Sequence, residues 1–171
     1  MCNSGWTLHK SDDAMPSTPV IIAASVAVFL GLIGGLMTPI GPWYRALRKP
    51  SWQPPDWLFG PAWTIILGLA AWSAVIAWNA ADGPVERRAV VILFATNAVA
   101  HFLWSPIFFK MRRPDWALIE VVFLWASLVA LVVGLWPISE KASLLIVPYL
   151  LWVSFAAWLN WAIVRLNRPF A

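Results

Sequence analysis

The chain carries one segment in which continuous helix is forbidden: Trp43-Tyr-Arg-Ala-Leu-Arg-Lys-Pro-Ser-Trp52-Gln-Pro-Pro-Asp-Trp57-Leu-Phe59-Gly-Pro61-Ala-Trp63. Pro50, Pro54 and Pro55 break and stiffen the backbone, because proline lacks the N–H and clashes with the preceding turn. Pro61 suits the first position of a helix, where a missing N–H costs nothing. We therefore predict a long rigid loop over residues 41–60, followed directly by a helix.

Five apolar runs surround this loop, and each has about the 20 residues that cross a hydrocarbon core. They must be helices, since lipid offers no water to unpaired backbone groups. The predicted fold is all-α, a polytopic membrane protein with a bundle of five transmembrane helices in residues 19–171, after a polar tail over residues 1–18. Met15 is an alternative start to Met1. The predicted spans are 19–40, 61–78, 89–109, 116–136 and 142–164.

The composition excludes a soluble domain. Hydrophobic residues make up 61% of the chain and charged residues only 12%, about half the charge of an average soluble domain. The net charge of +4 is better explained by positive residues that set the orientation in the membrane than by nucleic-acid binding. Cys2 is the only cysteine, so we predict neither a disulfide framework nor a cysteine metal site.

The distribution of Lys and Arg predicts the orientation. Eight of these residues fall on the side of the long loop and the C-terminus, and four fall on the other side. By the positive-inside rule, the loop and the C-terminus are cytoplasmic and the N-terminus is outside. Helical spans favour a bacterial inner membrane, with the outer membrane as the alternative. The larger set is Arg45, Arg48, Lys49, Lys110, Arg112, Arg113, Arg165 and Arg168, and the smaller set is Lys10, Arg87, Arg88 and Lys141.

Few polar side chains lie within the spans, and none forms a metal cluster. Asn97 and His101 share one helix face at a spacing of four residues. For Asn97 and Asn160 we favour hydrogen bonds between helices, and for Glu120 we expect the side chain to reach the interface. For His101 we favour a hydrogen bond to a neighbour or a ligand over axial ligation of haem, because no second metal ligand is evident.

The loop combines flat aromatic side chains with cations. Trp52, Trp57 and Phe59 could cover a cavity, while Arg45, Arg48 and Lys49 bring positive charge beside them. Such a set suits a planar, anionic, amphipathic ligand held by stacking and by charge. An anchor of tryptophans at the membrane interface explains the same residues equally well.

The segment Trp43–Trp63 resembles the first-loop signature of the translocator and tryptophan-rich sensory family (TspO/MBR). The resemblance continues in two further stretches. The chain departs from the family pattern at two positions, because family members usually have Asn at the position of His101 and commonly Gln at the position of Asn97. The two stretches are Asn97-Ala-Val-Ala-His101-Phe-Leu-Trp104-Ser-Pro-Ile-Phe-Phe109 and Val147-Pro-Tyr149-Leu-Leu-Trp152-Val-Ser-Phe155-Ala156-Ala-Trp-Leu159-Asn160.

The resemblance implies a five-helix bundle, often a homodimer in membrane lipid, with a pocket beneath the first loop. Family members bind tetrapyrroles such as protoporphyrin IX, and some bind haem, so the resemblance implies such a ligand and no required cofactor. Some members degrade protoporphyrin in light, and two tryptophans implicated there match Trp63 and Trp152. Ala156 matches a small position linked to ligand binding.

Helical spacing agrees with a single pocket. Tyr149, Trp152 and Ala156 share one face of the last helix, and we expect Trp63, Trp104, Tyr149 and Trp152 to converge. The favoured function is tetrapyrrole binding with a sensory or regulatory role; the alternatives are light-driven porphyrin degradation, which is not conventional enzyme chemistry, and porphyrin or sterol transport. The expected ligand-binding set is Trp52, Trp57, Phe59, Trp63, Asn97, His101, Trp104, Tyr149, Trp152, Ala156 and Asn160, with propionate contacts from Arg45, Arg48 and Lys49.

Two helix faces made of small residues are candidate contacts for a homodimer. Gly31 and Gly35 form one in the first span, and Thr96 and Ala100 form another in the third. Small residues spaced by four allow close helix contact. Each face suits contact between subunits and packing within one subunit equally well.

We predict that cysteines introduced at Ser51 and Ala171 in a Cys2→Ser background react with an impermeant thiol reagent from the cytoplasmic face. The measurement is labelling of right-side-out and inverted membrane vesicles. Preferential labelling from the opposite face would reverse the predicted orientation.

Overall fold

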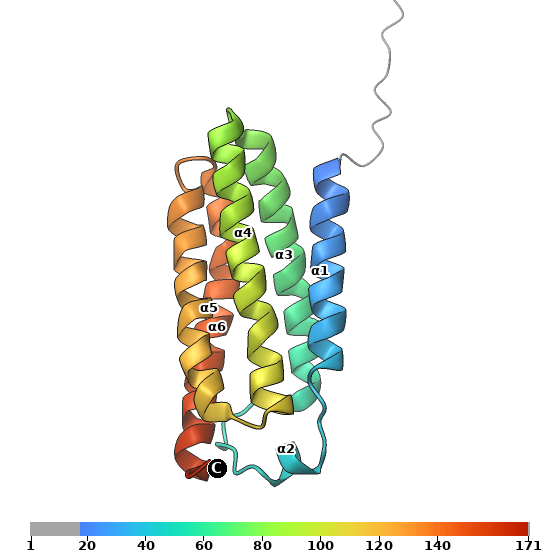
Figure 1. Ribbon diagram of the computed structural model, residues 1–171, viewed down its shortest axis with the longest axis vertical. Helices are drawn as coiled ribbons and strands as arrows, with labels where there is room; N and C mark the ends of the chain where they lie inside the picture. Colours follow the sequence, from blue (N-terminus) through green and yellow to red (C-terminus); the bar gives the residue numbers. More distant parts are fainter. Residues whose placement is uncertain (1–17, 171) are drawn as a thin grey trace, which may run out of the picture.

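The chain folds into a bundle of five long helices, which the computed structural model describes over residues 18–170 (Figure 1). Each of the five is long and apolar enough to cross a membrane, and no strand occurs among the described residues. The predicted all-α, five-helix fold is confirmed. The polar tail predicted over residues 1–18 lies, apart from Thr18, outside the described residues. The long helices are α1 (Thr18–Leu36), α3 (Phe59–Ala80), α4 (Pro84–Ser105), α5 (Pro114–Leu135) and α6 (Glu140–Asn167).

The helix boundaries follow local sequence signals. α4 and α5 each have proline at the start, where the missing N–H has no intrahelical role. α4 therefore begins five residues before the predicted span at 89. α6 begins at Glu140 because Ser139 caps it, accepting the N–H of Ala142 at 3.3 Å. α3 begins at Phe59 rather than at Pro61, and the proline remains within the first turn, where it is tolerated.

The connection between α1 and α3 is more structured than predicted. α1 ends at Leu36, four residues before the predicted end of the span. The loop then contains a short helix, α2 (Pro42–Ala46), and a 3-10 turn, η1 (Asp56–Leu58). A π-helical turn, η2 (Pro106–Lys110), also extends the end of α4.

The helices form a ring in the order α1, α3, α6, α5 and α4. Each packs on the next, and a lighter contact between α4 and α1 closes the ring. Figure 1 shows α1 at the edge of the bundle beside α3, and the α1–α3 connection running beneath the end that holds the C-terminus. α1 has no buried residue. The densest core lies between α5 and α6, at Leu128, Leu131, Leu135 and Ile146.

Hydroxyl and amide side chains join the helices in this core. Ser73 on α3 donates to the carbonyl of Ala142 on α6 at 2.6 Å. Asn97 on α4 donates to the hydroxyl of Ser127 on α5 at 2.9 Å, as expected for an interhelical bond. Such bonds matter in lipid because the polar groups have no water partner.

Glu120 does not reach the interface, so that expectation is wrong. Its side chain is only 8% exposed. It precedes Leu124 and Leu128 by four and eight residues, and therefore shares the face of α5 that packs into the core. Neither carboxylate oxygen has a hydrogen-bond partner among the described residues.

Asn167, at the end of α6, fastens the loop to the bundle. Its Oδ1 accepts the N–H of Arg48 at 2.8 Å, and its Nδ2 donates to the carbonyl of Arg48 at 2.8 Å. The same Nδ2 donates to the carbonyl of Ile163 at 2.8 Å. One side chain therefore holds the middle of the loop against the last helix.

We predict that Asn167→Ala releases the loop without unfolding the bundle. Each lost hydrogen bond is worth about 1 kcal/mol, so amide exchange at Arg48 should rise severalfold while exchange in α5 stays unchanged. Hydrogen–deuterium exchange of the detergent-solubilised protein measures this. Asn79→Ala, an exposed asparagine at the end of α3, is the control and should leave the loop unchanged. Equal exchange in both variants would show that Asn167 does not hold the loop.

Candidate functional site

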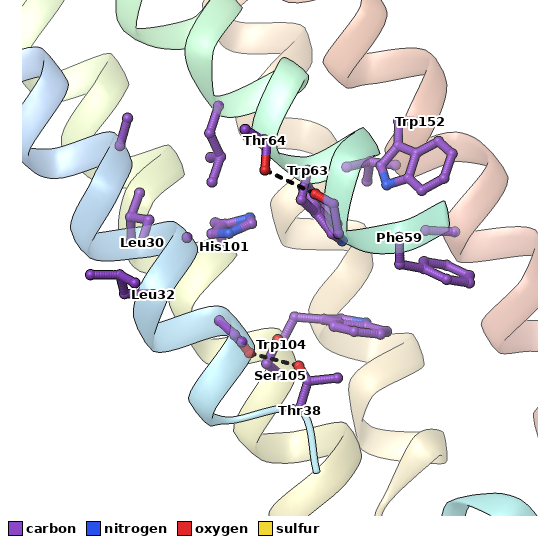
Figure 2. A pocket seen from close by; sticks show the side chains of 18 of the residues that line it. Leu30, Leu32, Thr38, Phe59, Trp63, Thr64, His101, Trp104, Ser105 and Trp152 are labelled. Carbon is purple, nitrogen blue, oxygen red and sulfur yellow. Dashed lines mark hydrogen bonds between the residues drawn. The ribbon is translucent and has the colours of Figure 1, made fainter. Parts of the chain in front are cut away.

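A cavity of about 1030 Å³ lies inside the ring, next to the loop, and every long helix contributes to its wall. Most of its lining is apolar and comes from α1, α3 and the lower part of α6. Figure 2 shows the aromatic end, where side chains from α3, α4 and α6 project toward one another. Ligand pockets in proteins span roughly 300–1,000 Å³, so this one has room for a large molecule.

Aromatic rings form one wall of the cavity. The rings of Trp63 and Trp152 meet edge to face, with centroids 6.2 Å apart and planes at 86°. Phe59 meets Trp152 in the same way, with centroids 5.8 Å apart. On the other side, Trp104 stacks on Phe108 with centroids 5.1 Å apart and planes at 27°. The arrangement leaves flat apolar faces beside the open space.

Three nitrogen-bearing side chains supply polarity to this end of the cavity. His101 Nδ1 lies 2.8 Å from the hydroxyl of Tyr149, which is the hydrogen bond to a neighbour expected for this histidine. The indole N–H groups of Trp104 and Trp152 are buried and have no acceptor among the described residues. A buried donor without an acceptor costs about 1–3 kcal/mol.

Most of the predicted ligand-binding residues lie on this cavity. Trp52 is not on the lining and packs edge to face against Phe155 and Trp158. Asn97 is engaged with Ser127, and Tyr149 stands behind His101 and Trp63, with its ring centroid 5.9 Å from that of Trp63. The predicted residues that line the cavity are Trp57, Phe59, Trp63, His101, Trp104, Trp152, Ala156 and Asn160.

The three predicted charge contacts lie in the loop and are not on the cavity lining. Arg45 and Arg48 are exposed, and the ammonium of Lys49 sits 3.5 Å from the centre of the Tyr44 ring. Asn160, in the orientation that satisfies its amide, donates to the carbonyl of Pro114 and accepts the N–H of Leu118. It therefore ties α6 to α5, as expected, and also borders the cavity.

A hydrogen-bonded cluster closes the loop side of the cavity. The hydroxyl of Tyr44 donates to Asp56 Oδ1 at 3.1 Å, and Gln53 Nε2 contacts both groups at 3.3 and 3.2 Å. Burial, and then the Asp56 carboxylate, raise the pKa of Tyr44 to about 12. Tyr44 therefore keeps its proton at neutral pH and remains a donor. Tyr44 and Asp56 both line the cavity, and the sequence reasoning did not single them out.

Small residues of α1 form the opposite wall, which the sequence reasoning also did not assign to a site. Gly31, Gly34 and Gly35 all line the cavity. A Cβ added at Gly34 or Gly35 would meet nothing within 4 Å, and one at Gly31 would touch Leu67 at 3.7 Å. The Gly31 and Gly35 face of α1, which could have served as a contact between subunits, thus turns toward the cavity within one subunit. The run of small residues was the available signal, but it does not reveal which way a helix faces.

These features define a class of protein: polytopic helical membrane proteins with a tryptophan-walled cavity under a proline-rich loop. The sequence model of the TspO/MBR family matches residues 22–166. The chain belongs to the TspO/MBR family and is an integral membrane protein.

Relatives of known name match most of the chain. It is 37% identical to the tryptophan-rich protein TspO of Chlorobaculum tepidum over 148 residues, which is 85% of this chain and 94% of the relative. It is 35% identical to the tryptophan-rich sensory protein of Cereibacter sphaeroides over 141 residues, 81% of this chain and 85% of that one. It is 33% identical to the human translocator protein over 127 residues, 74% of this chain and 75% of the human one.

Proposed function

We propose that this protein binds a tetrapyrrole of the protoporphyrin type in the cavity beneath its first loop and acts in a sensory or regulatory role. The observation that carries the proposal is the wall of flat aromatic rings, formed by Phe59, Trp63, Trp104 and Trp152, on one side of a cavity of about 1030 Å³. A porphyrin offers a flat apolar ring together with carboxylate acceptors. The resemblance to tryptophan-rich sensory proteins supports the same role.

The shape of the cavity supports a flat ligand. Ala156 lies one turn from Trp152 on α6, and both line the space, so the small side chain leaves room beside the indole. Each well-placed aromatic contributes on the order of 1 kcal/mol by stacking. The exposed cations Arg45 and Arg48 contribute less individually, because solvent screens them.

We predict that Ala156→Leu weakens protoporphyrin IX binding about tenfold or more, since the larger side chain enters the space for the ring; a tenfold change is about 1.4 kcal/mol. Quenching of tryptophan fluorescence in a fixed detergent measures the affinity. Ala126→Leu makes the same change on the exposed face of α5 and should bind like the parent. If Ala156→Leu binds normally while Ala126→Leu does not, the ring lies elsewhere.

Light-driven degradation of the porphyrin is the second candidate function. Trp63 and Trp152 lie in edge-to-face contact on the cavity wall. An indole gives up an electron far more readily than a phenyl ring, so this pair could reduce a light-excited or oxidised porphyrin in the presence of oxygen. No acid, base or metal site is required of the protein in such a reaction.

We predict that Trp152→Phe lowers the rate of light-dependent porphyrin loss much more than it lowers affinity. Phenylalanine retains most of the apolar area, so binding should weaken less than tenfold, whereas its ring is much harder to oxidise. Porphyrin absorbance followed in light and in dark, with Trp125→Phe on the exposed face of α5 as control, separates the two effects. Equal loss in light with both variants would show that Trp152 does not take part in the reaction, and no loss beyond the dark rate in the parent would leave binding as the function.

The membrane placement belongs to the same proposal. We place the loop and the C-terminus on the cytoplasmic side of a bacterial inner membrane, because the Lys and Arg residues gather at that end of the bundle. The cavity then receives its ligand next to the cytoplasmic loop. Association into a homodimer rests on the family resemblance.

A further inference from the structure

A single imidazole stands in the wall of a cavity whose lining is mostly apolar and aromatic. The sequence contains two histidines, His9 and His101, and His101 borders the cavity on α4. Figure 2 shows it between Trp63 and α1. No group of three or more His, Cys, Asp or Glu side chains that could hold a metal ion occurs in residues 18–170. A metal could therefore be bound here only if a ligand molecule supplied most of its coordination.

The ring of His101 is held in place from two sides. Its Nδ1 is hydrogen-bonded to the hydroxyl of Tyr149 at 2.8 Å, and Tyr149 is itself only 2% exposed. The edge of Trp63 packs on the imidazole with centroids 4.9 Å apart and planes at 68°. A histidine that binds a metal through one nitrogen almost always has its other nitrogen fixed by such a hydrogen bond.

The second nitrogen is left for a ligand. Nε2 makes no hydrogen bond to any described residue, while Nδ1 is already engaged. When Nδ1 carries the proton and donates it to the Tyr149 oxygen, Nε2 keeps an unshared electron pair. This is the arrangement in which a neutral imidazole binds a transition metal.

We propose that Nε2 of His101 is an axial ligand to the metal of a metallated tetrapyrrole, with Tyr149 as the positioning residue that orients the imidazole. The inference rests on the proposed tetrapyrrole binding and specifies which form of the ring the cavity prefers. The four ring nitrogens supply the ligands that the protein lacks. The new bond forms from the Nε2 electron pair to the metal and displaces a water from that axial position, so no electron is transferred.

The test compares haem with metal-free protoporphyrin IX on the full-length protein in detergent, in a His9→Gln background. With haem, the parent should give the absorption and electron paramagnetic resonance spectra of imidazole-ligated iron. His101→Ala and His101→Asn should lose these spectra and bind haem at least tenfold more weakly, while affinity for protoporphyrin IX changes less than threefold. Added imidazole should restore the ligated spectrum in His101→Ala.

Two further variants separate ligation from a structural role. Tyr149→Phe should retain the imidazole-ligated spectrum but weaken haem binding by roughly tenfold, the usual effect of removing the partner of a metal-binding histidine. Thr96→Ala, at an exposed polar position of α4 that is not on the cavity lining, should leave both the spectrum and the affinity unchanged.

The outcomes distinguish this inference from the proposed function. If neither porphyrin binds the parent protein, tetrapyrrole binding itself is wrong. If protoporphyrin IX binds and the haem spectrum is the same with and without His101, only the axial ligand is wrong. Should the His101 variants fail to fold, the parent protein labelled with ¹⁵N-histidine provides the test. Pulsed electron paramagnetic resonance of its haem complex should detect a histidine nitrogen bound to iron. The absence of that signal overturns the proposal.

Discussion

The absence of water from the hydrocarbon core of a bilayer is the constraint on which this structure depends. Every backbone N–H and C=O within a span must find its partner inside the protein, so all five apolar runs become helices. Irregular backbone is confined to the connections, above all the parts of residues 37–58 outside α2 and η1. The same constraint explains why the hydroxyls of Ser73 and Ser143 donate to backbone carbonyls of adjacent helices, those of Ala142 and Val132.

The cavity arises from uneven packing around the ring of helices. α5 and α6 fill the space between them with large aliphatic side chains such as Leu128 and Ile146. α1 faces the interior with glycine, and the space beside Gly34 and Gly35 is open. Aromatic side chains from α3 and α6 border that space without filling it. A dense half and an open half within one bundle allow a rigid frame to keep a large cavity.

The polar side chains fall into two groups: some join the helices of the bundle, and others lie at the cavity. Asn97 and Asn160 are satisfied by neighbouring helices and hold the frame together. Trp104 and Trp152 keep buried N–H groups without acceptors, and His101 keeps one nitrogen free of hydrogen bonds to the described residues. The polar groups of the helix core are therefore paired with one another, whereas those at the aromatic end of the cavity are not fully paired among the described residues.

The sequence by itself determined the five helices, the stiff loop and much of the aromatic part of the cavity wall, because apolar run length, proline positions and helical spacing are local properties that need no knowledge of neighbours. Trp152 and Ala156 could be placed on one helix face in this way, and the family resemblance added Trp63 to the same site. Tertiary structure decided the rest, because rotation about a helix axis depends on what the helix packs against. That rotation buries Glu120, turns Gly31 and Gly35 toward the cavity, sets Tyr149 behind His101, and leaves Trp52 against Phe155 rather than on the cavity wall.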